Sequence, residues 1–160
     1  MSAAGTRLNE AGLARALAQG ARLVAGGARR TDGRFGHGWF FEPTVLADVD
    51  PRSDIAQQEV FGPIVSVFKV TDLEEAIRLA NDVEYGLSAS ICTRDLDAAE
   101  RFVAASRSGV VGVNAPTAGI EVRAPLHGLK SSGLGPPEQG DDALAFFTEP
   151  KAVYIHTRGG

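Results

Sequence analysis

The middle of the chain alternates strand-like and helix-like patterns, and this alternation constrains the fold more than any other feature. Residues 64–70 form an apolar run of strand length that is rich in β-branched residues. A helical spacing of apolar residues follows at 71–80, and a strand at 87–93, a helix at 95–105 and a strand at 110–114 repeat the pattern. Short joints between such elements imply parallel strands linked by crossover helices. We therefore predict an α/β fold with a parallel βαβαβ core.

The two helices of this core carry further signals. Thr71, with Glu74 three residues later, is typical of a capping box and predicts the start of the first helix. In the second helix the spacing of Leu96, Ala99 and Val103 directs these three side chains inward.

The flanking segments are shorter and more irregular. Residues 8–21 have the periodicity of an amphipathic helix, and 22–25 are typical of a short strand. Pro43 interrupts the next apolar stretch, and because proline cannot donate a hydrogen bond to a sheet, we expect an edge strand or an extended segment there and not a central strand. Beyond residue 114 the chain is rich in glycine and proline, and it ends with a predicted helix at 138–147 and a strand at 152–157.

Composition excludes several classes of function. The net charge is −4 and the 16 basic residues are scattered, whereas nucleic-acid binders are usually basic on one face. No apolar run is long enough for a membrane helix, and the start has neither a basic leader nor an apolar core, so we expect a cytoplasmic protein without membrane or nucleic-acid partners. One cysteine and three widely separated histidines argue against a metal site.

Familiar nucleotide and thiol motifs are absent or weak. Gly128-Leu129-Lys130-Ser131 does not have the spacing of a phosphate-binding loop, and no glycine-rich dinucleotide turn follows a strand. Cys92 lies between Ile91 and Thr93 in a predicted strand with no histidine nearby in sequence. A small buried hydrophobe is therefore the favoured interpretation of Cys92, and a catalytic thiol is the weaker one.

Glu59 and Phe61 precede a Gly62-Pro63 break. A carboxylate can accept hydrogen bonds from both hydroxyls of a ribose, and a neighbouring aromatic ring can cover a flat heterocycle. Taken alone the pair is weak evidence, because a glutamate before a turn is usually a solvated surface group.

The motif does not stand alone, because further segments match one family in the same order along nearly the whole chain from about residue 11. Glu59-Val60-Phe61-Gly62-Pro63 resembles a signature of the aldehyde dehydrogenase superfamily. The other matching segments are Gly20–Gly27, Gly38–Leu46, Ala80–Asp82, Tyr85–Ala89, Thr93–Leu96, Gly109–Asn114, Lys130–Gly133 and Phe147–Lys151. The loop at 114–119 most resembles the semialdehyde dehydrogenase branch.

This resemblance implies a reaction and a set of site residues. Family enzymes oxidise an aldehyde through a thiohemiacetal on cysteine, transfer hydride to NAD or NADP, and hydrolyse the resulting thioester to the acid. Glu59 matches the ribose-binding glutamate and Phe61 the phenylalanine against the nicotinamide, so the chain would hold part of the cofactor site. Glu138 matches a possible proton relay, and Leu126 a wall of the small-aldehyde pocket.

The resemblance also implies a domain arrangement. Residues 1–150 would be an incomplete catalytic domain, and 151–160 a bridging strand and tail through which subunits pair. The partners that the resemblance implies are a second copy of the chain or the missing N-terminal half.

Departures from the family pattern point to an incomplete enzyme. The nucleophile segment and the dinucleotide-binding domain are expected upstream, and Cys92 does not match the nucleophile position. His127 replaces a family glycine, and Pro137 stands where an arginine usually precedes Glu138. We expect a C-terminal fragment of an NAD(P)-dependent aldehyde dehydrogenase that is inactive alone. The alternatives are a non-catalytic α/β remnant or subunit-interaction protein and, less favoured, a thiol enzyme based on Cys92.

Overall fold

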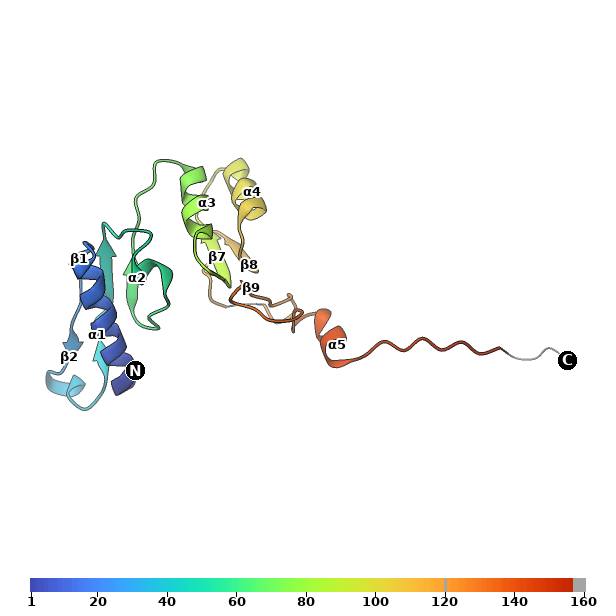
Figure 1. The fold of residues 1–160 in the computed structure, drawn as a ribbon, viewed down its shortest axis with the longest axis horizontal. Helices are drawn as coiled ribbons and strands as arrows, with labels where there is room; N and C mark the ends of the chain where they lie inside the picture. The colour runs from blue at the N-terminus through green and yellow to red at the C-terminus, as the bar shows by residue number, and fades with distance from the viewer. Residues whose placement is uncertain (120, 157–160) are drawn as a thin grey trace. The chain divides into compact units, whose positions relative to one another are not determined.

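The computed structural model describes residues 1–119 and 121–156, and these form two compact units (Figure 1). The first unit is Met1–Val83, and the second contains the described residues from Glu84 onward. This division lies inside the predicted partial catalytic domain of residues 1–150, so the boundary at residue 150 stays a prediction.

A three-stranded sheet organises the first unit. Its strand order is β1 (Arg22–Ala25), β4 (Thr44–Ala47), β5 (Ile64–Ser66), with β1 antiparallel and β5 parallel to β4. Helix α1 (Ala3–Ala18) and the short helix α2 (Asp54–Gln57) accompany the sheet. The predicted strand at 22–25 is confirmed, whereas the first helix begins and ends earlier than its apolar periodicity suggests.

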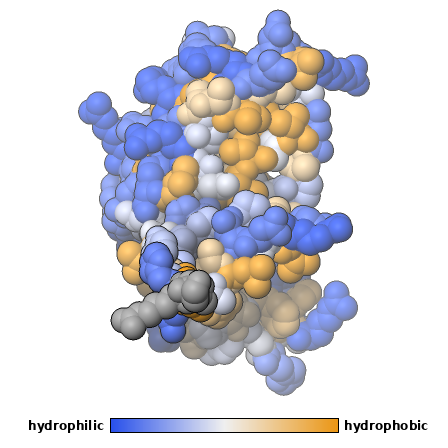
Figure 2. All heavy atoms as spheres, turned by 90° about the vertical axis from the view of Figure 1, so that its right-hand side faces the viewer, coloured by the Kyte–Doolittle hydropathy of each residue, from blue (hydrophilic) through white to orange (hydrophobic). Residues whose placement is uncertain are grey.

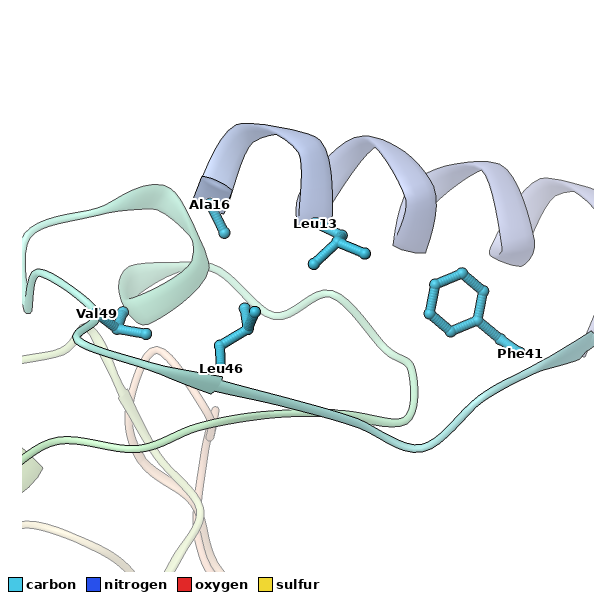
Figure 3. Packing of buried hydrophobic residues seen from close by; sticks show 5 residues of the cluster. All are labelled: Leu13, Ala16, Phe41, Leu46 and Val49. Atoms are coloured by element: carbon cyan, nitrogen blue, oxygen red, sulfur yellow. The ribbon is translucent and has the colours of Figure 1, made fainter. Parts of the chain in front are cut away.

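The core of this unit lies between α1 and β4. Leu13 and Ala16 point from α1 toward Leu46 on β4 and Val49 just beyond it, and Phe41 closes one end of the cluster (Figure 3). Burial alternates along β4, as expected for a strand with one face covered by a helix.

The position of β4 corrects the prediction of an edge strand near Pro43, because β4 is the central strand of the sheet. Pro43 lies just before the first residue of β4, so its missing N–H removes no hydrogen bond from the ladder. The ladder continues from the next residue, where the Thr44 amide donates to the Pro63 carbonyl at 2.8 Å.

The rest of the first unit is a small hairpin and a helix. Strands β2 (Arg29–Arg30) and β3 (Phe40–Phe41) pair antiparallel around the 3-10 turn η1 (Gly33–Phe35). Helix α3 spans Leu73–Asn81 and is capped by Asp72, one residue later than the predicted Thr71.

The second unit contains a complete βαβ element. Strand β7 (Ser88–Ile91) runs parallel to β8 (Val110–Val113), and helix α4 (Leu96–Ala105) connects them. Strand β6 (Tyr85–Gly86) pairs antiparallel with β9 (Leu129–Lys130). Helix α5 covers Asp142–Phe147, a shorter range than predicted.

These pairings confirm an α/β fold with parallel strands and place its strands more exactly. The predicted βαβαβ run contains β7–α4–β8 as expected, whereas β5 pairs with β4 in the first unit. On α4 the buried residues are Ala99 and Phe102, and the predicted inward residues Leu96 and Val103 are exposed. The buried face of α4 is therefore narrower than the predicted apolar stripe and slightly rotated from it.

The predicted C-terminal strand is only partly within the described residues. Residues 152–156 form no ladder with the described part of the chain and are exposed, and Thr157 lies outside the described residues. A strand that pairs with another subunit would find no partner inside one chain, so its existence stays a prediction. Among the described residues, no helix is both long and apolar enough to cross a membrane.

Candidate functional site

The Glu59–Gly62 turn joins α2 to β5 in the first unit. Phe61 has a φ of 56°, a left-handed conformation that is uncommon for an aromatic residue. Its side chain is 84% exposed, and the Glu59 side chain is exposed as well. The turn therefore presents a carboxylate and an aromatic ring to solvent instead of packing them inside.

Helix α1 explains how this turn is held. A Cβ added to Gly62 would lie 1.6 Å from Oδ1 of Asn9, and one added to Gly12 would lie 3.3 Å from Cγ1 of Val60. Asn9 is fully buried, and its Nδ2 donates to the Gly5 carbonyl at 2.8 Å. The backbone of the turn thus rests directly on α1, and only glycine fits at position 62.

A hollow of about 420 Å³ lies along the turn. Glu59 and Phe61 both line it, and the other lining residues are Ile55, Gln58, Val60, Gly62, Ile64 and Ser66. An exposed carboxylate beside an exposed ring can accept ribose hydroxyls and cover a flat heterocycle. These residues fit the nicotinamide-ribose half of a dinucleotide, and the first unit brings the two predicted cofactor residues together.

In the second unit the structure brings Leu126 and Glu138 together. The Glu138 amide donates to the Leu126 carbonyl at 3.4 Å, a long backbone bond that joins the two segments. Leu126 is half-buried and the Glu138 side chain is exposed. Glu138 precedes α5, so the prediction that it begins a helix is wrong, because Pro137 before it and Gly140 after it favour a turn.

A second hollow of about 420 Å³ follows strand β8. It is lined by residues 109–112, which include most of β8, by residues 115–119, and by Glu121, Ala124 and Pro125. Asn114, at the start of this loop, was not singled out from the sequence. The available signal was an asparagine directly after an apolar strand and close before a proline.

Cys92 directly follows β7 and is exposed, so the prediction of a buried cysteine is wrong. The strand ends at Ile91, two residues before the predicted end at Thr93, and the thiol therefore lies outside the ladder. His127 is half-buried, and its carbonyl lies so close to Gly109 that a Cβ there would be 1.5 Å away. The His127 substitution thus lies in a tightly packed backbone crossing.

An ion pair lies at the second hollow, where Nε of Arg123 is 3.2 Å from Oε1 of Glu121. Two further interactions lower the pKa of carboxyl groups that line neither hollow. Arg30 hydrogen-bonds Asp32 and lowers the pKa of that carboxyl to about 2. Hydrogen bonds from the Thr71 amide and hydroxyl lower the pKa of Glu75. In the same described part of the chain, no three of the histidine, cysteine, aspartate and glutamate side chains gather as a metal site would require.

Comparison with known proteins agrees with this geometry. The chain is 51% identical over 140 residues to alpha-ketoglutarate semialdehyde dehydrogenase of Haloferax volcanii, covering 87% of this chain and 29% of that protein. It is 43% identical over 136 residues to 2,5-dioxopentanoate dehydrogenase of Saccharolobus solfataricus, covering 84% of this chain and 28% of that protein.

Solved structures give the same result. The structure of P. syringae indole-3-acetaldehyde dehydrogenase with NAD+ and IAA superposes with a TM-score of 0.89 at 36% identity, over 98% of this chain and 31% of that one. Betaine aldehyde dehydrogenase of Staphylococcus aureus in complex with NAD+ gives a TM-score of 0.86 at 32% identity, over 98% and 32%. The chain thus spans under a third of the length of the relatives it matches. Because the aldehyde dehydrogenase family model also matches residues 2–153, the chain belongs to the aldehyde dehydrogenase family.

Proposed function

We propose that this chain forms the C-terminal part of the catalytic domain of an NAD(P)-dependent aldehyde dehydrogenase that oxidises an aldehyde or semialdehyde to the carboxylic acid. The observation that carries the proposal is the first hollow, where Glu59 and Phe61 are exposed side by side on a turn held by α1. The semialdehyde dehydrogenase names of the relatives at 51% and 39% identity support the substrate class.

The first unit would hold one end of the cofactor. Glu59 would accept hydrogen bonds from the ribose hydroxyls, and Phe61 would lie against the nicotinamide ring, which when bound supplies the hydride acceptor. The NAD+ bound in structural relatives supports an NAD-type cofactor, either NAD or NADP. The described residues offer no glycine-rich helix start for the pyrophosphate, so this site is half of a dinucleotide site.

The second unit would form the aldehyde side. Leu126 would supply an apolar wall, and Glu138, exposed and joined to Leu126 through the backbone, would pass a proton to or from water. The second hollow, bounded by residues 115–119, would accommodate the carbon chain of a small aldehyde.

Catalysis would require a cysteine nucleophile from elsewhere. Cys92 is exposed beyond the end of β7, and among the described residues no hydrogen bond joins its thiol to a histidine or glutamate that would activate it. We therefore expect the 160 residues to be inactive alone and to act with the upstream portion of the enzyme, in a cytoplasmic assembly of several copies.

The test supplies that portion in trans. The upstream segment of a related semialdehyde dehydrogenase, mixed with this chain, should restore NAD+ reduction with a semialdehyde. Glu59→Gln should raise the KM for NAD+ about tenfold, since it weakens a charge-assisted hydrogen bond. Turnover by the chain alone that disappears in Cys92→Ser would overturn the proposal, and so would micromolar NAD+ binding to the chain alone.

The exposed C-terminal segment favours a second candidate function, subunit interaction without catalysis. Val153, Tyr154 and Ile155 are 67%, 85% and 81% exposed, and such an apolar stretch promotes association. Sedimentation over a concentration series separates the candidates. Dimers without any activity in the trans mixture would favour the interaction protein, whereas restored activity would favour the enzyme.

A further inference from the structure

Asn114 connects the ends of the two parallel strands of the second unit. Its Oδ1 accepts from the Thr93 amide at 2.9 Å, and its Nδ2 donates to the Thr93 carbonyl at 2.9 Å. Its own amide donates to the Ile91 carbonyl at 2.8 Å. The side-chain amide thus imitates one more rung of the β7–β8 ladder, which ends at the pair of Ile91 and Val113. We call the two side-chain bonds the Asn114–Thr93 clasp.

The backbone at Asn114 leaves the sheet while its side chain stays bound to it. Its φ is 55°, in the left-handed region that asparagine tolerates better than most residues. The chain therefore turns sharply out of β8 at this residue. A residue whose side chain carries no amide group could adopt the left-handed turn, but it could not form both bonds of the clasp.

The turn sends the chain into residues 115–119, which form one wall of the second hollow. A second tether holds the start of this loop, because the Ser90 hydroxyl donates to the Ala115 carbonyl at 2.6 Å. The loop is exposed and has only small side chains, so it has little apolar packing of its own. In the described part of the chain, hydrogen bonds of Asn114 and Ala115 tie the start of this wall to the end of β7 and to Thr93 beyond it.

We propose that Asn114 is a positioning residue of the aldehyde site, acting through the clasp to set the distance between residues 115–119 and strand β8. The proposal rests on the proposed function, since it assigns the second hollow to the aldehyde chain. It adds a specificity determinant. When both bonds of the clasp are formed, the hollow accommodates small, unbranched aldehydes. When they are broken, residues 115–119 can move away from β8, and longer aldehydes fit.

The first experiment uses the 160-residue chain alone. Asn114→Asp keeps the left-handed turn and the acceptor for the Thr93 amide but loses the donor to the Thr93 carbonyl. Asn114→Gly keeps the turn and loses both bonds. Thr93→Val is the matched control, because the clasp uses only the backbone of Thr93.

NMR hydrogen exchange and amide relaxation report the result. The Thr93 amide should exchange about tenfold faster in Asn114→Gly, as expected for loss of the Asn114 acceptor, and stay protected in Asn114→Asp and Thr93→Val. Amides of residues 115, 117, 118 and 119 should become mobile in both Asn114 variants and remain ordered in the control. Unchanged order in both Asn114 variants would overturn the positioning role.

The second experiment uses the trans mixture with the upstream portion. In Asn114→Asp the KM for a short semialdehyde should rise about fivefold, the scale of one lost hydrogen bond, while the KM for NAD+ stays constant. Selectivity should shift toward longer aldehydes. A parallel rise in both KM values would indicate a general structural effect and contradict the proposal. If the wild-type mixture is inactive, the proposed function fails, and the NMR experiment still decides whether the clasp positions the loop.

Discussion

The three-stranded sheet of the first unit and the β7–β8 pair of the second unit differ in how much apolar side-chain surface each one buries. The first unit encloses Leu13, Ala16, Phe41, Leu46 and Val49 in one cluster, and Ile77 is buried as well. Among the described residues of the second unit, the buried hydrophobic side chains are Ala99 and Phe102.

The second unit also exposes many of its large apolar side chains. Leu134, Leu144 and Phe147 are 99%, 74% and 78% exposed. Figure 2 shows that apolar residues gather in patches on one face of the molecule, bordered by hydrophilic ones. The difference teaches that the first unit encloses the larger apolar core, whereas the second unit buries few of its apolar side chains within the described residues.

The largest loss of stability is expected when the side chain at the centre of the first unit's core is removed. Leu46 is fully buried on the central strand, so Leu46→Ala should destabilise the first unit by ~2–5 kcal/mol through lost burial and a residual cavity. Hydrogen exchange read separately for each unit measures the change. The matched variant Leu134→Ala, at a fully exposed leucine, should cost under ~0.5 kcal/mol. Equal effects of the two leucine variants would contradict the comparison.

Phe102→Ala tests the small core of the second unit. Phe102 is 6% exposed, and its loss should destabilise the β7–α4–β8 element by ~3 kcal/mol, the low end for a buried phenylalanine. Leu96→Ala on the same helix is the control, since Leu96 is 69% exposed and should cost little. Amide exchange in β7 and β8 reports the result. A larger cost for Leu96 would show that the sequence-predicted stripe is the packed one.

Gly62→Ala tests the contact between α1 and the Glu59–Gly62 turn. A methyl group at position 62 would overlap Asn9, so we expect a cost of ~1–3 kcal/mol from overpacking. The double variant with Asn9→Ala should recover most of that loss, because it removes the overlapping side chain. Urea unfolding of the wild type, the two single variants and the double variant completes a double-mutant cycle. Additive losses of unfolding free energy would mean that the two residues are not in contact.

The smallest expected effect is electrostatic. Hydrogen bonds from Thr71 lower the pKa of Glu75 from 4.5, so the charged carboxylate favours the folded state. This contribution is present above pH 4.5 and is lost as the pH falls through the lower folded-state pKa. An NMR titration of the Glu75 carboxyl should give a midpoint below 4.5. Glu75→Gln should flatten the acid side of the stability profile of α3, and a midpoint above 4.5 would contradict the cap.

Local signals in the sequence were sufficient to predict several strands and helices and to bring Glu59 and Phe61 together at the first hollow. The strand Arg22–Ala25 and the parallel pair joined by α4 follow from patterns that depend on neighbouring residues alone. The pairing of Glu59 with Phe61 was also predictable, because two residues that close in a turn must face the same region.

Features that depend on distant contacts were not predictable in the same way. Pro43 suggested an edge strand, yet β4 is central because the ladder needs no donor before Thr44. Cys92 follows the apolar Ile91 in a segment predicted as a strand, but it lies past the last paired residue of β7. Asn9 contacts Gly62 and Asn114 contacts Thr93 across long stretches of sequence, so a local pattern does not identify the partner of either asparagine.

The order of pairing in the first sheet has a kinetic consequence. Both ladders join segments far apart in sequence, with Arg22 opposite Ala47 and Thr44 opposite Ile64. Loop closure must therefore precede most of the stabilising contacts, which slows folding relative to a chain whose contacts are local. Strand β4 takes part in both ladders and carries Leu46 into the core, so the collapse of α1 and β1 onto β4 is the step that should limit the rate. Helix α1 would gain stable structure only when this step is complete.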